Sequence, residues 1–163
     1  MRKLIISGIE EVVHNYDVDG VHFDDYFYPY PGTGKEIPDE AAFKKYGGKF
    51  HNKGDWRRDN VNVLIKEVYE RVKKIKSHVK FSVSPFGIWR NKDTDSTGSD
   101  THGLQCYDSL YADSRKWIKQ QWIDFIVPQI YWSDHWKAAR YDVLVKWWNE
   151  EMKETDVQVR KLV

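Results

Sequence analysis

The sequence predicts an α/β fold in which helices alternate with parallel strands. Apolar residues recur at helical spacing in four segments, and short apolar runs with strand character lie between them, so the expected order is α-β-α-β-α-β-α. The loops that leave the strands are long, whereas the turns that enter them are as short as Ser77-His78. Long loops of this kind are usually functional, and α/β barrels build their sites at the carboxyl ends of the strands.

The first half of the chain contains two expected helices and one strand. Residues 1–15 carry apolar side chains at helical spacing and lead into a strand over residues 18–24. An irregular stretch rich in Gly, Pro and aromatic residues follows, over residues 25–55. Asp55 is expected to cap the next helix, which spans residues 56–76. The apolar face of that helix comprises Val61, Leu64, Ile65, Val68, Val72 and Ile75.

The second half repeats the pattern. A second strand is expected over residues 79–84, where Pro85 follows it, and a long loop leads to a helix over residues 111–121. A third strand covers residues 123–132, and an amphipathic helix covers residues 137–152.

Three strands cannot close a barrel, because a (β/α)8 domain takes about 250 residues. We therefore interpret residues 1–163 as a single segment of a partial (β/α)8 TIM barrel with about three central βα units, truncated at both ends. A parallel sheet left open in this way has two unpaired edges. We accordingly expect the chain either to self-associate through those edges or to pack loosely.

Composition excludes several classes of function. Lys and Arg number 26 against 25 Asp and Glu, so the basic footprint of a nucleic-acid binder is missing. The single cysteine, Cys106, permits no intrachain disulfide and no zinc cluster of its own. Residues 1–10 lack the apolar core of a signal peptide, and no segment approaches a membrane span. The protein is then either cytoplasmic or exported by a signal outside these residues.

The end of the first expected strand carries the strongest candidate for chemistry. Side chains alternate along a strand, so His22 and Asp24 share one face and Asp25 turns into the loop. A buried polar pair on an apolar strand needs hydrogen-bond partners or a function. The alternative is that both aspartates only accept hydrogen bonds from backbone amides of the loop.

Three blocks of sequence resemble the bacterial glycosyl-hydrolase-like family 10. They are Asp19-Gly20-Val21-His22-Phe23-Asp24-Asp25-Tyr26-Phe27-Tyr28-Pro29, then Phe81-Ser82-Val83-Ser84-Pro85-Phe86-Gly87-Ile88-Trp89-Arg90-Asn91, and finally Tyr111-Ala112-Asp113-Ser114 with Asp124-Phe125-Ile126-Val127-Pro128-Gln129-Ile130-Tyr131-Trp132. This TIM-barrel family is related to the retaining glycosidases and includes enzymes that act on peptidoglycan glycan strands. The resemblance implies that the three strands correspond to the fourth, fifth and sixth of the barrel. It also implies a periplasmic, cell-surface or secreted protein with a carbohydrate substrate and no cofactor.

Glycoside hydrolysis requires two carboxyl groups, either about 5 Å apart or roughly 6.5–9.5 Å apart with a water between them. Asp24 fits the nucleophile or the carboxylate that stabilises the oxocarbenium ion. By similarity to the fourth strand of amylase-type barrels, His22 is expected to hold Asp24 ionised or to bind a sugar hydroxyl.

The second carboxylate is less well defined. Its candidates are Asp25, Asp134 and the loop residues Asp93 and Asp95, and the group can also lie outside this chain. Asp25 and Asp24 are adjacent and point apart, while Asp134 is equally placed to cap the final helix.

The remaining site candidates are polar or aromatic residues near strand ends. Gln129 and Tyr131 share a face of the third strand, where an amide and a phenol suit hydrogen bonding to sugar hydroxyls. Trp89 and Trp132 end their strands and offer ring faces to a sugar, and Tyr26 completes the expected substrate-binding set. Core packing is the alternative for each of these side chains. Whether Arg57 and Arg58 are surface charges or orient the first loop stays open.

Two rival functions remain. A non-catalytic carbohydrate-binding segment, or an inactive piece of a barrel, fits the incomplete strand count. A metal-dependent polysaccharide deacetylase is disfavoured because that class needs a His-x-x-x-His pair, which none of the 6 histidines supplies. No metal site is predicted.

Overall fold

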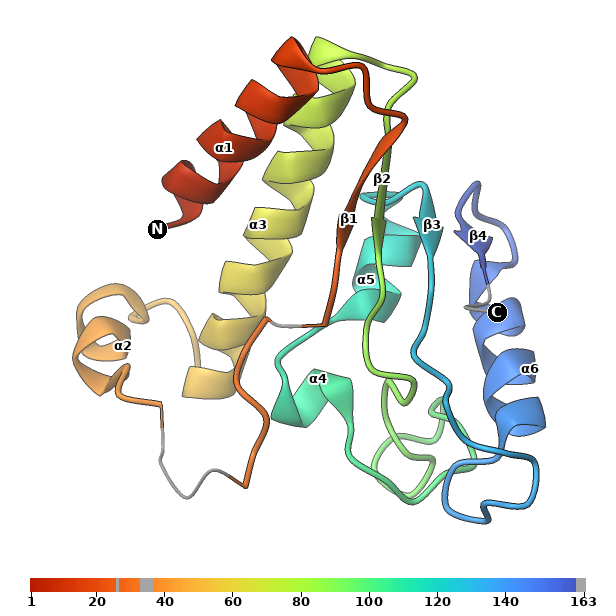
Figure 1. Cartoon of the computed structure of the whole chain (residues 1–163). Helices are drawn as coiled ribbons and strands as arrows, with labels where there is room; N and C mark the ends of the chain where they lie inside the picture. The colour runs from red at the N-terminus through yellow and green to blue at the C-terminus, as the bar shows by residue number, and fades with distance from the viewer. Residues whose placement is uncertain (26, 33–36, 161–163) are drawn as a thin grey trace.

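Four parallel strands flanked by helices make up the fold. The computed structural model describes residues 1–25, 27–32 and 37–160. The helices are α1 (Arg2–Asn15), α2 (Glu40–Tyr46), α3 (Lys53–Ile75), α4 (Cys106–Ser109), α5 (Ser114–Lys119) and α6 (Tyr141–Met152). The strands are β1 (Gly20–Phe23), β2 (Lys80–Val83), β3 (Phe125–Ile126) and β4 (Gln158–Val159). The predicted α/β class is confirmed (Figure 1).

The strands lie in the order in which they occur along the chain, and each neighbouring pair is parallel. A parallel sheet whose order never reverses is compatible with part of a (β/α)8 barrel, whereas a doubly wound sheet reverses part-way. The prediction of only three strands is wrong, because β4 follows α6 and pairs with β3. At two residues, β4 is too short to show a strand pattern in the sequence.

The third strand is much shorter than the ten residues expected. Only Phe125 and Ile126 form a regular ladder with β2. Beyond Ile126 the amides of Val127 and Gln129 donate to the carbonyls of Val83 and Pro85 at 2.9 Å, and Phe86 and Gln129 form an isolated bridge. Pro85 has no amide hydrogen to donate between these two bonds, so the regular ladder stops there. This bridge matters for the site, because it holds Gln129 beside the end of β2.

Helix boundaries also differ from the prediction. Helix α3 begins at Lys53 because the Asn52 side chain accepts a hydrogen bond from the Asp55 amide at 2.8 Å, so Asn52 and not Asp55 is the N-cap. The helix expected over residues 111–121 is shorter: α5 begins at Ser114, where the Asp113 side chain caps it, and Tyr111, whose φ is 55°, lies in the turn that separates it from α4. Helix α2 lies within the stretch expected to be irregular.

The core lies between the sheet and α3. Phe81 and Val83 of β2 are fully buried, as are Ile65 and Val68 of α3. Helix α1 packs along α3 on the side away from β3 and β4 (Figure 1). The long loops that leave the strands gather at one end of the sheet, opposite the short turns that enter them (Figure 1). In the described part of the chain, no helix is both long and apolar enough to cross a membrane.

Candidate active site

A hydrogen-bonded polar cluster covers the face of the sheet that the helices leave uncovered. His22 of β1 is paired in register with Ser82 of β2. The His22 ring lies over two serines, with Nδ1 2.7 Å from the Ser82 hydroxyl and Nε2 3.0 Å from the Ser84 hydroxyl. Both serines are buried, whereas His22 is exposed. The alternation of strand side chains therefore produces an apolar face toward α3 and a polar face opposite.

The Asp24 carboxylate lies at the end of β1 and is held through one oxygen. Its Oδ1 accepts three hydrogen bonds: from the Gln129 side-chain amide at 2.7 Å, from the Asp25 backbone amide at 2.8 Å and from the Ser84 hydroxyl at 3.2 Å. Its Oδ2 has no hydrogen-bond partner among the described residues, and the side chain is exposed. The arrangement fixes the orientation of an acceptor-only carboxylate and leaves one oxygen accessible.

Gln129 brings the end of β3 to Asp24. Its Nε2 donates both to Asp24 and, at 3.1 Å, to the Ser84 carbonyl. Because both partners are acceptors, the amide nitrogen must face them and Oε1 must face away. The structure thus brings together three of the predicted site residues, His22, Asp24 and Gln129. It adds Ser82 and Ser84, which the sequence analysis did not select as site residues.

Asp25 lies beside Asp24 in sequence but is buried, with 2% of its surface exposed. Its Oδ2 accepts a hydrogen bond from the Tyr30 hydroxyl, and its Oδ1 has no hydrogen-bond partner among the described residues. Burial raises the pKa of Asp25 to about 6, while the Tyr30 hydroxyl and the Phe86 amide act in the opposite direction. Burial argues against direct contact between Asp25 and a substrate. Its contacts fit anchoring of the loop after β1.

Trp89 requires a correction. The prediction that it stacks on a sugar is not supported, because the residue is 5% exposed and its ring stacks on Trp147 with a centroid separation of 5.8 Å. The Arg115 guanidinium also lies 4.9 Å from the Trp89 ring centroid. The tryptophan fills the base of the loop after β2 and offers no ring face to a ligand.

The residues that follow β3 lie nearer the surface. Tyr131 is 71% exposed, and Trp132 packs edge-on against Phe86 with ring centroids 5.4 Å apart. Asp134 accepts a hydrogen bond from the Asp142 amide at 3.1 Å, which is a contact with the first turn of α6. Tyr26 lies outside the described residues. The catalytic and substrate-binding roles predicted for Asp134, Tyr131, Trp132 and Tyr26 stay predictions.

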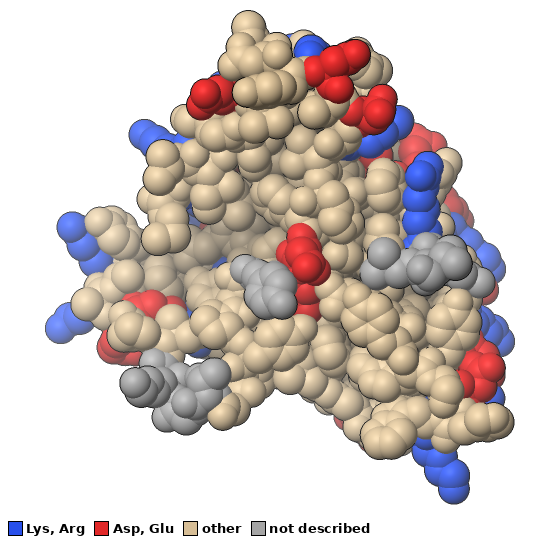
Figure 2. Space-filling model, viewed as in Figure 1, with Lys and Arg blue, Asp and Glu red and all other residues tan. Residues whose placement is uncertain are grey.

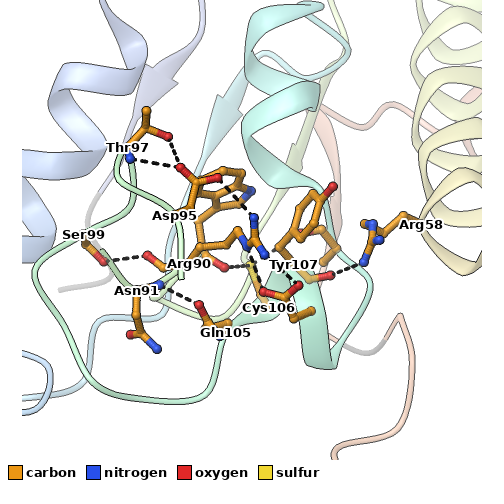
Figure 3. Close-up of polar contacts among 12 residues, drawn as sticks. Arg58, Arg90, Asn91, Asp95, Thr97, Ser99, Gln105, Cys106 and Tyr107 are labelled. Carbon is orange, nitrogen blue, oxygen red and sulfur yellow. Dashed lines mark hydrogen bonds and ion pairs between the residues drawn. The ribbon is translucent and has the colours of Figure 1, made fainter. Parts of the chain in front are cut away.

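The loop after β2 is held by its own polar side chains (Figure 3). Arg90 pairs with Asp108 at 2.9 Å and with Asp95 at 3.1 Å. Hydrogen bonds from the Thr97 side chain and backbone, with the charge of Arg90, lower the pKa of Asp95. A carboxyl group held in this ionised state is poorly suited to act as a general acid. Asp93, the other loop candidate, is exposed and pairs with His102 at 3.0 Å.

Sequence reasoning left Arg57 undecided, and the structure places it in a buried cluster beneath the first loop. Its guanidinium donates two hydrogen bonds to Asp39, at 2.6 and 2.7 Å, and one to the Tyr111 hydroxyl at 2.7 Å. The same group lies over the Tyr28 ring, 5.7 Å from its centroid. Arg57 therefore orients the first loop. No helical pattern could reveal this, because its partners are distant in sequence.

Figure 2 shows one face of the molecule, on which Lys and Arg side chains lie mainly around the rim. A small acidic group lies near the middle, and the described residues next to it are mostly uncharged (Figure 2). This face offers little attraction to a polyanion. The described residues contain no cluster of three or more His, Cys, Asp or Glu side chains placed to hold a metal ion.

Comparison with known proteins identifies the family. The sequence model of the family described as "Glycosyl hydrolase-like 10" matches residues 1–161. The chain is 54% identical over 160 residues to glycosyl hydrolase YngK of Bacillus subtilis (strain 168), covering 97% of this chain and 31% of that protein. It is 51% identical over 151 residues to glycosyl hydrolase DigH of Escherichia coli (strain K12), covering 93% of this chain and 34% of that protein. The chain belongs to the glycosyl hydrolase-like 10 family.

Membership in this family confirms the resemblance drawn from the three sequence blocks. The chain spans about a third of the length of the curated relatives that it matches. Their printed names describe glycosyl hydrolases and specify neither a sugar nor a catalytic residue. The polar cluster around Asp24 is formed by residues from the matched region.

Proposed function

We propose that this chain forms one side of the active site of a glycoside hydrolase, in which Asp24 is the nucleophile or the carboxylate that stabilises the oxocarbenium-like transition state. The observation that carries this proposal is the asymmetry of the Asp24 carboxylate. Three donors hold Oδ1, while Oδ2 is free among the described residues. A reacting carboxylate requires a fixed orientation and one unobstructed oxygen.

The second carboxyl group is proposed to come from residues outside this chain. Asp25 is buried against Tyr30, and Asp134 is engaged with the first turn of α6. Asp134 remains the alternative within the chain, because its side chain is exposed and lies on the loop that follows β3.

The proposed substrate is a polysaccharide, and peptidoglycan glycan strands are the first to test. Gln129 presents Oε1 away from Asp24, where it suits acceptance of a hydrogen bond from a sugar hydroxyl. Tyr131 and Trp132 lie on the same loop as Gln129 and are proposed to contact the sugar chain, as is the exposed face of His22. With such a substrate, the protein is proposed to act outside the cytoplasm.

The test is hydrolysis by the longer protein that contains this chain, compared with its Asp24→Asn variant. Denuded peptidoglycan glycan strands and a panel of neutral polysaccharides serve as substrates, and released reducing ends are measured. The amide of the Asp24→Asn variant retains an oxygen for the three donors but loses the charge, so we expect kcat to fall by at least about 10³-fold without unfolding. Asp17→Asn, at an exposed position in the turn that enters β1, is the matched control and should retain activity. Full activity of Asp24→Asn contradicts the proposal.

A non-catalytic carbohydrate-binding segment is the second candidate. It is favoured by the exposed aromatic residues Tyr131 and Trp136, which are 71% and 58% exposed. Binding of glycan strands to the longer protein, with no product from any substrate in the panel, would support it.

A further inference from the structure

Ser84 lies at the junction between His22 and Asp24. Its hydroxyl oxygen is 3.0 Å from His22 Nε2 and 3.2 Å from Asp24 Oδ1. Among the described residues, the hydroxyl of the other serine, Ser82, has a hydrogen bond only with the second ring nitrogen, 2.7 Å from Nδ1. Ser82 and Ser84 are 2% and 3% exposed. The two hydroxyls therefore face the same imidazole from beneath, but only one of them also touches the carboxylate.

The positions of the protons follow from donor and acceptor capacity. An ionised carboxylate only accepts hydrogen bonds, so the Ser84 hydroxyl must donate its single proton to Asp24 Oδ1. The Ser84 oxygen can then only accept from His22, which requires a proton on Nε2. In a neutral imidazole Nδ1 is then unprotonated, and it accepts the proton of the Ser82 hydroxyl.

We infer that Ser84 is a positioning residue of the proposed active site: it fixes His22 as the Nε2–H tautomer and orients the Asp24 carboxylate. The chain of hydrogen bonds runs from Ser82 through His22 and Ser84 to Asp24, and Gln129 closes it by donating to both Asp24 and the Ser84 carbonyl. Ser82 provides the hydrogen-bond partner of the second ring nitrogen of His22 but has no contact with Asp24. The kinetic part of this inference rests on the proposed function, whereas the tautomer does not.

Nitrogen NMR of the protein labelled with ¹⁵N-histidine tests the tautomer without any substrate. At pH 8 we expect His22 to show a protonated Nε2 and an unprotonated Nδ1. His22→Gln identifies its signals among those of the 6 histidines. A predominant Nδ1–H tautomer, or an equal mixture, overturns the inference whatever the activity of the protein.

Two serine variants separate the roles of the hydroxyls. Ser84→Ala removes the acceptor for Nε2–H, and we expect His22 to become a mixture of tautomers. Ser82→Ala leaves the link between His22 and Asp24 intact and should keep Nε2–H predominant. Ser84→Thr retains the hydroxyl and should restore the wild-type signals, which distinguishes loss of the hydroxyl from a disturbed fold. Unchanged His22 signals in Ser84→Ala would overturn the inference.

If the longer protein is active, kcat supplies a second readout. A hydrogen bond to a charged group implies that Ser84→Ala lowers kcat by about 10- to 100-fold with little change in KM, since the hydroxyl orients Asp24 and leaves substrate contacts in place. The control is Ser114→Ala, which removes a buried hydroxyl that contacts the Cys106 thiol outside the cluster and should stay within about threefold of wild type. An equal loss of kcat in both variants would contradict the special position of Ser84. A protein without measurable hydrolysis would contradict the proposed function, and the NMR result would still decide the tautomer.

Discussion

Strand β2 buries two pairs of side chains on opposite faces of the sheet, and the two pairs serve different purposes. Phe81 and Val83 of β2 face the helices and are fully buried among apolar side chains, with Phe81 edge-on to Phe23 at 5.1 Å. Ser82 and Ser84 alternate with them along the same strand and are buried beneath a histidine ring. Burial on the first face contributes packing energy, whereas burial on the second face orients hydrogen bonds that hold a carboxylate.

The sharpest test of this contrast compares neighbours on β2. Phe81→Ala leaves a cavity in the core, so we expect the free energy of unfolding to fall by about 3–5 kcal/mol. Ser82→Ala removes one hydrogen bond to a neutral ring and should cost no more than about 1.5 kcal/mol. Urea unfolding followed by tryptophan fluorescence measures both. Equal losses would show that the polar face contributes to stability as much as the core does.

Arg57 extends the contrast to a buried ion pair outside the sheet. Arg57→Ala leaves the Asp39 carboxylate without its principal partner, so we expect a loss of about 3 kcal/mol. Arg57→Lys keeps the charge but loses the paired hydrogen bonds, so its stability should lie between that of the wild type and that of Arg57→Ala. Lys66→Ala, which removes an exposed ion pair with Glu70, is the control and should change stability by less than about 0.5 kcal/mol. Thermal unfolding ranks the variants, and an Arg57→Ala result close to the control would contradict the assignment.

Asp25 gives a pH-dependent test. Burial raises its pKa from 3.8 to about 6, so between these values the unfolded chain releases a proton that the folded chain retains. The free energy of unfolding should therefore fall as pH rises from about 4 to about 6 and then level off, by up to about 3 kcal/mol.

Asp25→Asn should remove this decrease and make the chain more stable than wild type near neutral pH. Tyr30→Phe removes a hydrogen bond that lowers the Asp25 pKa, so it should extend the decrease to higher pH. Stability curves of identical shape for wild type and Asp25→Asn, measured by urea unfolding at several pH values, would show that Asp25 is not the responsible group.

The smallest effect concerns the edge of the sheet. We propose that the 163-residue chain self-associates weakly, because β1 ends the sheet and α1 exposes apolar side chains, with Leu4 77% and Val12 44% exposed. Sedimentation velocity should show an average mass that rises above 19.5 kDa with concentration, and Leu4→Lys should reduce the rise. A mass that is independent of concentration contradicts this proposal.

Much of the fold could be predicted because its signals are local. The apolar face of α3 and the alternation of β1 follow from spacing within single segments, and the order of elements follows from their succession along the chain. Helix ends were less predictable: Asn52 and Asp55 are both competent caps, and only the backbone geometry selects Asn52. Strand β4 was missed because a two-residue strand exists only through its partner.

The residues of the candidate site also fall into those that the sequence predicted and those that only the structure revealed. Sequence reasoning selected His22, Asp24 and Gln129 from residue type and position at strand ends, and the structure brings them together. It placed Trp89 in the substrate-binding set with core packing as the alternative, because a strand-end tryptophan has the same sequence signature whether it lies at the surface or beneath a loop. It passed over Ser84, since a hydroxyl acquires its role only from the atoms around it.

The sequence by itself determined the α/β class, the polar face of β1 and the family, because each depends on residue types at fixed spacing along the chain. Only the tertiary structure decided which Asp24 oxygen is held, where Arg57 points and that Asp25 is buried. These features depend on contacts between residues as far apart in sequence as Asp24 and Gln129, and pairing across such distances is set by the packing of the whole sheet and its loops.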